Sequence, residues 1–526
     1  MRKIFLTITI TLTAIIAGAQ TTTRCENPML WADVPDPDVI RVGSDYYMVS
    51  TTMHLMPGVP VMHSRDLVHW ETISYVCDKI TDTPLYDLEG GTVYGRGQWA
   101  TSIRYHKGTY YLLFSPNDQP YRSFIYSAKD PAGPWRLQCR TNHFHDASLF
   151  IDDDDRVYVF YGTGQVAELN KDFSGLKEGG LRATVFKRDQ TETGLLEGSR
   201  VIKKDGKYYL LMISWPNGQK RRQVCYRADR IEGPYEKEVI LTDNFKGFPY
   251  VGQGTIVDDI NGNWYGVIFQ DRDGVGRVLT LEPCTWKDGW PMLGDENGRI
   301  PESFEVPLTP YLPEEGITGS DDFEGKKLKK IWQWNHNPIN SMWSLTEREG
   351  WLRLKTSRIT DNLFLAPNTI TQRMMGPECE ATVCIDLSAM KDGDVCGMAA
   401  FNGDSGLLSI AQEGKRRTLQ LTFESVELKD PGKQVVGVKK EEIATVSLRN
   451  SKIWLRIHGD FNLGKDLATF SYSTDGKTFS TIGREFKMRF DYRRFFMGTK
   501  FALYCYATKQ YGGWADFDDF TFKQWR

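Results

Sequence analysis

A pattern that recurs five times in the first 300 residues constrains the fold of this chain more than any other feature. In each copy a short turn is followed by one or two aromatic residues that open an apolar stretch typical of a β-strand. The copies are GSDYYMVS (43–50), HKGTYYLLFS (106–115), DDDDRVYVFYG (152–162), KDGKYYLLMIS (204–214) and INGNWYGVIFQ (260–270). A period of roughly 45 to 65 residues, each a set of short strands, is typical of a β-propeller. Five repeats predict five blades.

The segment about ten residues upstream of each aromatic strand is expected to form the innermost strand of its blade, next to the central axis. The five segments carry, in order, Asp36, Trp99, Asp146, Glu197 and Gln253. Equivalent positions of a propeller converge on one central funnel. Three carboxylates from three different blades are therefore predicted to meet in one pocket.

Three neighbouring carboxylates suit the hydrolysis of a glycosidic bond, which needs one carboxyl group as proton donor and a second in its ionised form. Like charges push the pKa values of neighbouring groups apart, so a third acid can tune and orient the donor. Asp36 lies in VPDPDVI, Asp146 in FHDASLF and Glu197 in LLEGSRVI, whose leucines favour a protonated donor. Each residue alone also fits a structural role: a turn aspartate, a strand cap, or a buried glutamate paired with Arg200. Their shared register favours a functional site.

Five further residues are candidates for substrate binding. Trp99 and Trp215 lie near strand ends, where an indole ring can stack on a sugar. Arg277, in GVGRVLTL, can donate paired hydrogen bonds to hydroxyls or to a catalytic carboxylate, although an interblade salt bridge is an open alternative. Gln253 occupies the axial register of the fifth blade. His54 follows the first aromatic strand, where a structural role is equally open.

Other classes of site find no support in the sequence. The eight histidines form no H-E-x-x-H motif, the nine cysteines form no C-x-x-C pair, and the run 152–155 lacks the glycine and the distal glutamate of a calcium loop. No G-x-S-x-G elbow or phosphate-binding loop is present. The formal net charge of −3 argues against nucleic acid or an anionic membrane as the main partner.

The N-terminus, MRKIFLTITITLTAIIAGAQ, has the layout of a secretory signal peptide over residues 1–19. A basic start at Arg2 and Lys3 precedes an apolar stretch and an A-x-A cleavage site at 17–19. We expect an exported mature chain, periplasmic or secreted. No other segment approaches the roughly 20 apolar residues of a membrane-spanning helix.

A second domain follows the repeats. Residues 20–302 are interpreted as the propeller, and 303–319 (SFEVPLTPYLPEEGITG), rich in Pro, Glu and Gly, as a linker. Strand patterns then dominate, as in TLQLTF (418–423) and IWLRI (453–457). The whole chain is therefore expected to be all-β, with a second all-β domain over 320–526.

The ordered motifs of the first 290 residues resemble glycoside hydrolase family 43. They are NPMLWADVPDPDVIRVGSDYYMVSTT (27–52), WATSIRYHKGTYYLLFS (99–115), FHDASLFIDDD (144–154), LEGSRVIKKDGKYYLL (196–211), GQGTIVDD (252–259) and GVGRVLTLEPCTWKDGWPM (274–292). The resemblance implies an inverting mechanism on a five-bladed propeller. It implies Asp36 as general base, Glu197 as general acid, and Asp146 as the pKa modulator and orienter of the acid.

The resemblance also bears on cofactors. Many members of this family carry a histidine in a G-H-G motif of the fifth blade, where it can hold a central ion or water. Gln253 takes that place here. We therefore do not expect an axial calcium ion, and no cofactor is expected to be required.

Residues 320–526 resemble the concanavalin-like β-sandwich, a jelly roll, that follows the propeller in β-xylosidase-type members. In such relatives a loop of the sandwich can close over the sugar pocket. Trp332, Trp334 and Asn335 are the candidates for that role here.

The resemblance leaves the sugar open. The segments LWADVPDP and TTMH and the residue Gln253 favour an exo-acting α-L-arabinofuranosidase that trims plant hemicellulose side chains, for example of xyloglucan or arabinoxylan. A β-D-xylosidase acting on xylo-oligosaccharides is the alternative, and a non-catalytic carbohydrate-binding protein is a second one. The natural polysaccharide, the oligomeric state and the disulfide pattern cannot be read from the sequence.

Overall fold

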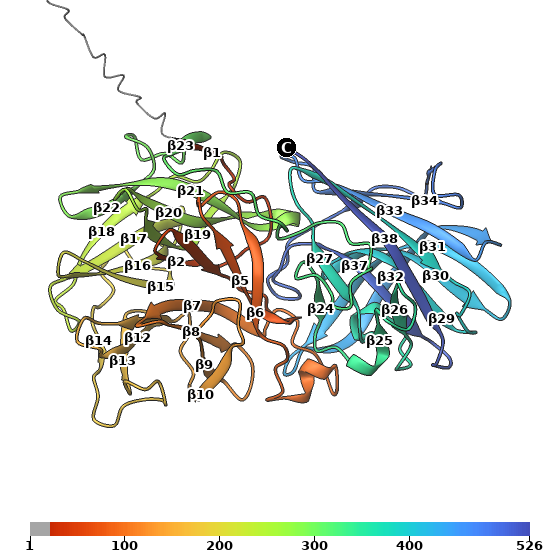
Figure 1. Cartoon of the computed structure of the whole chain (residues 1–526), viewed down its shortest axis with the longest axis horizontal. Coiled ribbons are helices and arrows are strands. Elements are labelled where there is room, and N and C mark those ends of the chain that lie inside the picture. Colours follow the sequence, from red (N-terminus) through yellow and green to blue (C-terminus); the bar gives the residue numbers. More distant parts are fainter. Residues whose placement is uncertain (1–20) are drawn as a thin grey trace, which may run out of the picture.

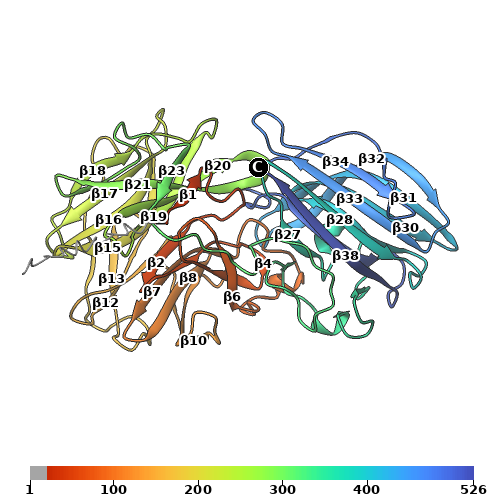
Figure 2. The same cartoon turned by 45° about the horizontal axis from the view of Figure 1, so that its top comes forward.

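The computed structural model describes residues 21–526, so the predicted signal peptide lies outside the described residues. The described chain is built from β-strands, with four short 3-10 turns at Pro84–Asp87, Asp273–Val275, Asn340–Met342 and Leu363–Leu365. Two domains lie side by side, the first in red to green and the second in green to blue (Figures 1 and 2). Over residues 21–526 no helix is long and apolar enough to cross a membrane.

The first domain is a five-bladed β-propeller, as predicted. Each blade is a four-stranded antiparallel sheet whose strands follow one another along the chain. Blade one contains β2 (Asp38–Val42), β3 (Asp45–Val49), β5 (Gly58–Ser64) and β6 (Glu71–Cys77). Blade two contains β7 (Gln98–His106), β8 (Thr109–Pro116), β9 (Arg122–Ala128) and β10 (Arg136–Asn142). Blade three contains β11 (Ser148–Ile151), β12 (Val157–Tyr161), β13 (Gln165–Leu169) and β14 (Arg182–Thr184). Blade four contains β15 (Leu195–Lys204), β16 (Lys207–Trp215), β17 (Arg222–Ala228) and β18 (Glu236–Leu241). Blade five contains β19 (Tyr250–Asp258), β20 (Trp264–Arg272), β21 (Gly276–Lys287) and β22 (Trp290–Leu293).

The place of a strand within its blade follows from its pattern of side chains. The inner strand β19 is buried along nearly its whole length, whereas the outer strand β10 alternates between exposed and half-buried residues. A strand covered on both faces packs between neighbouring blades, and an alternating strand leaves one face in water. The aromatic stretches that recur in the sequence form the second strands, such as β8 and β16, and supply the apolar contacts between blades.

The propeller ring closes through the chain that precedes blade one. Strand β1 (Thr23–Glu26) pairs with β23 (Ser303–Val306), which lies at the start of the segment interpreted as a linker. A little further along, Leu30 forms a bridge with Leu279 in blade five. The backbone N–H of Val34 then donates to the carbonyl of Arg277 at 2.9 Å. These contacts carry the chain into the centre of the ring just before Asp36.

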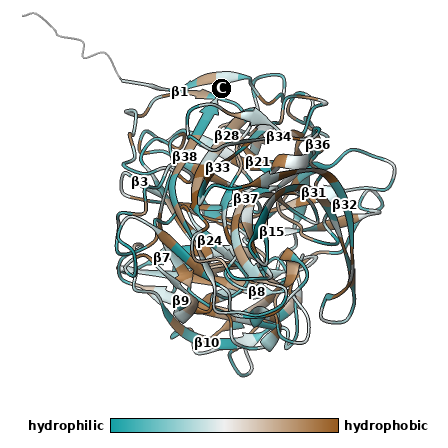
Figure 3. Ribbon diagram, turned by 90° about the vertical axis from the view of Figure 1, so that its right-hand side faces the viewer, coloured by the Kyte–Doolittle hydropathy of each residue, from teal (hydrophilic) through white to brown (hydrophobic). Residues whose placement is uncertain are grey.

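The second domain is the predicted concanavalin-like β-sandwich of two eight-stranded sheets. One sheet contains β24 (Gln333–Asn335), β27 (Ile370–Arg373), β29 (Asp394–Phe401), β30 (Asp404–Glu413), β31 (Arg416–Lys429), β32 (Gln434–Leu448) and β37 (Lys500–Ala507). The other contains β25 (Trp343–Ser344), β26 (Leu352–Lys355), β28 (Glu378–Asp386), β33 (Lys452–Asp460), β34 (Leu467–Ser473), β35 (Ser480–Thr481), β36 (Phe486–Lys487) and β38 (Trp514–Trp525). Hydrophilic and hydrophobic residues both occur along strands such as β38 (Figure 3). Its Ala515, Phe517 and Phe520 are buried in one core cluster with Phe501 and Leu503 of β37 in the other sheet.

The two domains share a sheet. The short strand β4 (Leu55–Met56) leaves blade one and pairs with β24 at the edge of the sandwich, so that Trp334 lies opposite Met56. The first sheet of the sandwich therefore takes its eighth strand from the propeller. This continuous hydrogen bonding holds the second domain beside the opening of the propeller.

Candidate active site

A cavity of about 520 Å³ lies where the inner strands of the propeller meet the second domain. Asp36, Asp146 and Glu197 all line this cavity, although they come from three different blades. Its volume is within the roughly 300–1,000 Å³ that small-molecule sites occupy. The structure thus brings together the three carboxylates that share a register in the sequence.

Local irregularities of the backbone aim the side chains into the cavity. The inner strands β7, β15 and β19 each contain a bulge, between Gln98 and Thr101, between Glu197 and Arg200, and between Val251 and Gly254. A bulge re-aims the side chains on its strand, and Trp99, Glu197 and Gln253 lie at these three bulges. The other two carboxylates reach the cavity from left-handed backbone, with φ of 54° at Asp36 and 46° at Asp146. Left-handed backbone is uncommon for non-glycine residues, and here it turns the chain just before the inner strands β2 and β11.

Asp36 is held by two side chains from different parts of the propeller. The hydroxyl of Thr51 donates to Oδ2 at 2.6 Å, and Nη1 of Arg277 lies 3.4 Å from the same oxygen. The Asp36 side chain is only 13% exposed. Both contacts are to Oδ2, and the residue lines the cavity.

The centre of the propeller is occupied by Arg200, whose side chain is fully buried. Its guanidinium donates to the backbone carbonyls of Asp36 at 2.9 Å and Thr101 at 3.1 Å. Gln253 accepts from the same guanidinium at 2.9 and 3.1 Å in the amide orientation that satisfies both groups. The oxygens that a central calcium ion would need are therefore bound to a cation already. The residues present therefore do not fit an axial calcium ion. The guanidinium of Arg200 bonds to groups at the propeller axis and not to Glu197.

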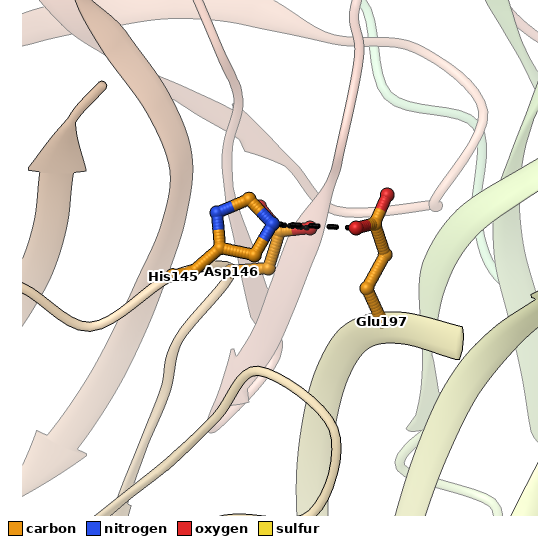
Figure 4. A group of neighbouring side chains, drawn as sticks. All are labelled: His145, Asp146 and Glu197. Atoms are coloured by element: carbon orange, nitrogen blue, oxygen red, sulfur yellow. Dashed lines mark hydrogen bonds and ion pairs between the residues drawn. The ribbon is translucent and has the colours of Figure 1, made fainter. Parts of the chain in front are cut away.

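Glu197 and Asp146 share a neighbour that the sequence analysis did not single out. Nε2 of His145 lies 3.2 Å from Oε2 of Glu197 and 3.7 Å from Oδ2 of Asp146 (Figure 4). Glu197 is partly exposed, at 34% of its side chain, so the leucines beside it in the sequence do not enclose it. The ring of His145 packs against Trp99, with the ring centres 5.7 Å apart.

Burial, the charge of His145 and the neighbouring carboxylates together determine the protonation of this group, with His145 acting to lower the pKa of Asp146. Burial raises the pKa of Asp146 to about 7, and the carboxylates of Glu197 and Asp36 act in the same direction. The carboxylate of Asp146 and the hydrogen bond to Glu197 raise the pKa of His145. The cluster therefore holds a proton that its members share near neutral pH.

The sandwich domain supplies one wall of the cavity, through Phe490, Tyr492 and Phe496. The ring of Phe496 lies 5.6 Å from that of Trp99, and the guanidinium of Arg277 lies 4.6 Å from the centre of the Phe496 ring. These residues lie in the loop between β36 and β37. The second domain therefore does contribute to the cavity.

The three residues proposed for that wall from the sequence lie elsewhere, which corrects the expectation. Trp332 is buried in the sandwich and donates from Nε1 to Asp321, and Trp334 packs against Trp343. Asn335 donates to the hydroxyl of Tyr94 at 2.7 Å, so it contacts the propeller away from the cavity. All three belong to the packing between and within the domains.

A buried ion pair fixes the loop against the propeller. Oδ2 of Asp33 accepts from the backbone N–H of Gly498 at 2.8 Å and from Nζ of Lys500 at 3.1 Å. Its other oxygen accepts from the backbone N–H of Arg277 at 3.0 Å. Asp33 thus ties the loop that carries Phe496 to the strand that carries Arg277.

His54 is not part of the cavity. Its ring is fully buried and packs against Tyr94, His336 and Phe495 at the contact between the domains. Burial lowers the pKa of His54 well below its usual value, so the ring is neutral. The candidate substrate-binding residue of the sequence analysis is in this structure a packing residue.

A second polar pair lies in the cavity and was not found in the sequence. Nη1 of Arg221 bonds Oδ2 of Asp271 at 2.8 Å, and its guanidinium lies over the rings of Trp215 at 4.5 Å and Tyr250 at 4.9 Å. All four residues line the cavity. An aromatic surface beside a donor and an acceptor is a frequent arrangement in sites that bind polyhydroxylated ligands.

Comparison with known proteins decides the family. The model of glycosyl hydrolases family 43 matches residues 25–291, and that of the beta xylosidase C-terminal concanavalin A-like domain matches residues 320–523. The chain belongs to glycosyl hydrolases family 43. The first match contains Asp36, Asp146 and Glu197, and the second contains the loop with Phe496.

Curated relatives of this family 43 glycosidase carry two kinds of name. A beta-xylosidase of Formosa agariphila is 29% identical, covering 94% of this chain and 90% of the relative. The non-reducing end alpha-L-arabinofuranosidase BoGH43B of Bacteroides ovatus is 30% identical, covering 77% of this chain and 78% of the relative. Among solved structures, a bifunctional GH43-CE protein of Bacteroides eggerthii is 38% identical with a TM-score of 0.87. That match covers 96% of this chain and 64% of the longer protein.

Proposed function

We propose that this family 43 enzyme is an exo-acting, inverting glycoside hydrolase that releases terminal α-L-arabinofuranosyl residues from hemicellulose side chains or oligosaccharides. The observation that carries the proposal is the convergence of Asp36, Asp146 and Glu197, from three different blades, in one cavity walled by both domains. Glycoside hydrolysis requires a protonated and an ionised carboxyl group on either side of the bond. A protein that only binds sugar does not need several carboxyl groups close together in one cavity, because burying charged groups costs free energy.

In the proposed mechanism Glu197 gives a proton to the leaving oxygen, while Asp36 takes a proton from the attacking water. The contacts from Thr51 and Arg277 hold the Asp36 carboxylate in place within the cavity. Asp146 is held next to Glu197 by its left-handed backbone and influences the proton on the acid through its charge. Trp99, Trp215, Gln253 and Arg277 line the cavity and are the proposed substrate contacts.

The shape of the cavity supports exo action. Phe490, Tyr492 and Phe496 of the second domain add a wall to the cavity that the propeller forms. A cavity of about 520 Å³ accommodates a terminal sugar and part of the group attached to it. The enzyme is thus expected to remove one sugar at a time.

A β-D-xylosidase is the alternative, supported by the beta-xylosidase names of relatives such as that of Formosa agariphila. The test is hydrolysis of 4-nitrophenyl α-L-arabinofuranoside against 4-nitrophenyl β-D-xylopyranoside, with Glu197→Ala as control. Dominant turnover of the arabinofuranoside, lost in the variant, is the expected result. Dominant turnover of the xyloside would assign the alternative with the same catalytic residues, and turnover of neither would favour a binding protein.

We propose that no metal ion is required, because Arg200 supplies the positive charge at the propeller axis. Dialysis against EDTA is expected to leave kcat and the melting temperature unchanged. The measurement is a rate assay and a thermal melt before and after dialysis. A loss of activity that calcium restores would refute this assignment.

The aromatic wall is expected to contribute to sugar binding. Phe496→Ala should lower kcat/KM by about 10-fold or more, mostly through a higher KM, because it removes the ring that Trp99 and Arg277 pack against. Steady-state kinetics of the variant measures this split. Tyr511→Ala, at an exposed aromatic residue of the same domain, is the matched control. An unchanged KM in Phe496→Ala would show that the wall does not touch the substrate.

We also propose that the enzyme acts outside the cytoplasm, in the periplasm or as a secreted protein. The proposal rests on the signal-peptide layout of residues 1–19. Cell fractionation with an antibody against the mature chain tests it.

A further inference from the structure

His145 is placed to act on the acid without being part of the assigned machinery. Its Nε2 faces Oε2 of Glu197 at 3.2 Å, while its side chain is 38% exposed (Figure 4). Its backbone is fixed, because its carbonyl accepts from the N–H of Gly162 at 2.8 Å. One side of the ring thus contacts the acid, and part of the ring remains open to water.

The chemistry leaves a proton imbalance after each turnover. Inverting hydrolysis removes a proton from Glu197 and adds one to Asp36. Before the next cycle Glu197 must regain a proton and Asp36 must release one to water. A neighbouring group that already carries a proton and contacts Glu197 can supply it when the next substrate binds, which is within the steps that kcat/KM reports.

We propose that His145 supplies the proton that reloads Glu197. The Nε2–H proton of the imidazolium moves to Oε2 of Glu197, which leaves a neutral imidazole and a protonated carboxyl group. The imidazole then takes a proton from solvent water or buffer, and Asp36 returns one, so the cycle balances. The inference rests on the proposed function, because it requires Glu197 to be the acid.

The charges around His145 allow this transfer in either direction. The groups that face it are Glu197, Asp146 and, further away, Asp36, and His143 is a nearby ring of the same segment. In the free enzyme the negative charges favour the imidazolium. When a sugar fills the cavity and displaces water, a pair of opposite charges is disfavoured relative to the neutral pair. Substrate binding therefore drives the proton from His145 onto Glu197.

The test is the pH dependence of kcat/KM for His145→Gln, measured with a phenyl glycoside of the sugar that the wild-type enzyme hydrolyses. Glutamine can still hydrogen-bond to Glu197 but cannot carry a proton. The alkaline limb of the profile reports the proton that the cluster shares. We expect this limb to move to lower pH by about 1 unit or more, with about a 10-fold or larger loss at pH 8 and a smaller loss at pH 5.

The direction of the shift separates the proposal from a simple charge effect. If His145 acted only as a positive neighbour, its removal would make Glu197 easier to protonate and would move the alkaline limb to higher pH. A limb that moves up or stays in place overturns the proposal. His143→Asn, which changes a histidine two residues away that does not contact Glu197, is the matched control, and thermal melts check folding.

His145→Asn provides a second variant in case the glutamine does not fit. The failure of this proposal is distinguishable from a failure of the proposed function. If Glu197→Gln shows no dependence on the leaving group, the assignment of the acid is wrong. If Glu197→Gln behaves as an acid variant but neither His145 variant moves the alkaline limb down, only the reloading role is wrong.

Discussion

Replacing Asp36 with asparagine is expected to lower kcat by about 10²- to 10⁴-fold for every glycoside substrate, whatever its leaving group. The amide is nearly isosteric and can still accept the hydrogen bond from Thr51, but it cannot take a proton from water. The base works on the attacking water rather than on the departing oxygen. An activated leaving group therefore does not compensate for its loss. Rates on phenyl and 2,4-dinitrophenyl glycosides measure the effect.

The matched control for this variant is Asp155→Asn. Asp155 lies in the turn at the end of β11 that is remote from Asp146, and it pairs there with Lys107 on the surface. The control should retain wild-type rates and the wild-type melting temperature. If Asp36→Asn kept the wild-type kcat while correctly folded, Asp36 would not be the base.

Replacing Glu197 with glutamine is expected to give the opposite dependence on the substrate. The loss in kcat should reach about 10²- to 10⁴-fold on a phenyl glycoside, whose leaving oxygen needs a proton. It should be much smaller on a 2,4-dinitrophenyl glycoside, because that phenolate departs without protonation. The measurement is kcat for a series of aryl glycosides of increasing phenol acidity.

Asp36→Asn and Glu197→Gln serve as controls for each other, because each replaces one carboxylate of the same cavity by the corresponding amide. A uniform loss in Glu197→Gln would mean that this residue binds or positions the substrate instead. Asp146→Asn, which changes the third carboxylate, should leave a partial dependence on the leaving group, since Asp146 acts through Glu197.

The positions of Asp36, Asp146 and Glu197 could be predicted because a propeller maps a sequence period onto one axis. Each repeat places its inner strand at the same distance from the centre, so equivalent positions converge. The alternation of turn and aromatic strand was enough to locate blades one to five. No knowledge of side-chain contacts was needed for either prediction.

The wall from the second domain could not be predicted in this way. Phe496 lies about 300 residues after Glu197 in the sequence, and nothing in the repeat says which loop of a sandwich meets the propeller. The bulky Trp332 and Trp334 drew attention by composition, but a tryptophan of a sandwich most often fills its core. The buried pair of Asp33 with Lys500 joins segments that the sequence gives no reason to associate.

Two other errors have local causes. His54 follows an aromatic strand, but Met53 before it has a left-handed φ of 53°, and the chain turns away into the contact between the domains. His145 directly precedes Asp146 in FHDASLF, so the signal was present. Where the backbone is irregular, the residue before a cavity carboxylate can contact the same neighbours as the carboxylate does. The position of His145 directly before Asp146 therefore marks it as a candidate.

The most direct test of the account is the proton NMR spectrum of the sugar first released from an aryl glycoside. The account predicts inversion, so an α-L-arabinofuranoside should first yield the β anomer, and a β-D-xyloside the α anomer, before mutarotation mixes the two. First appearance of the anomer that the substrate already has would show a retaining mechanism. It would contradict the assignment of Asp36 as a base that activates water.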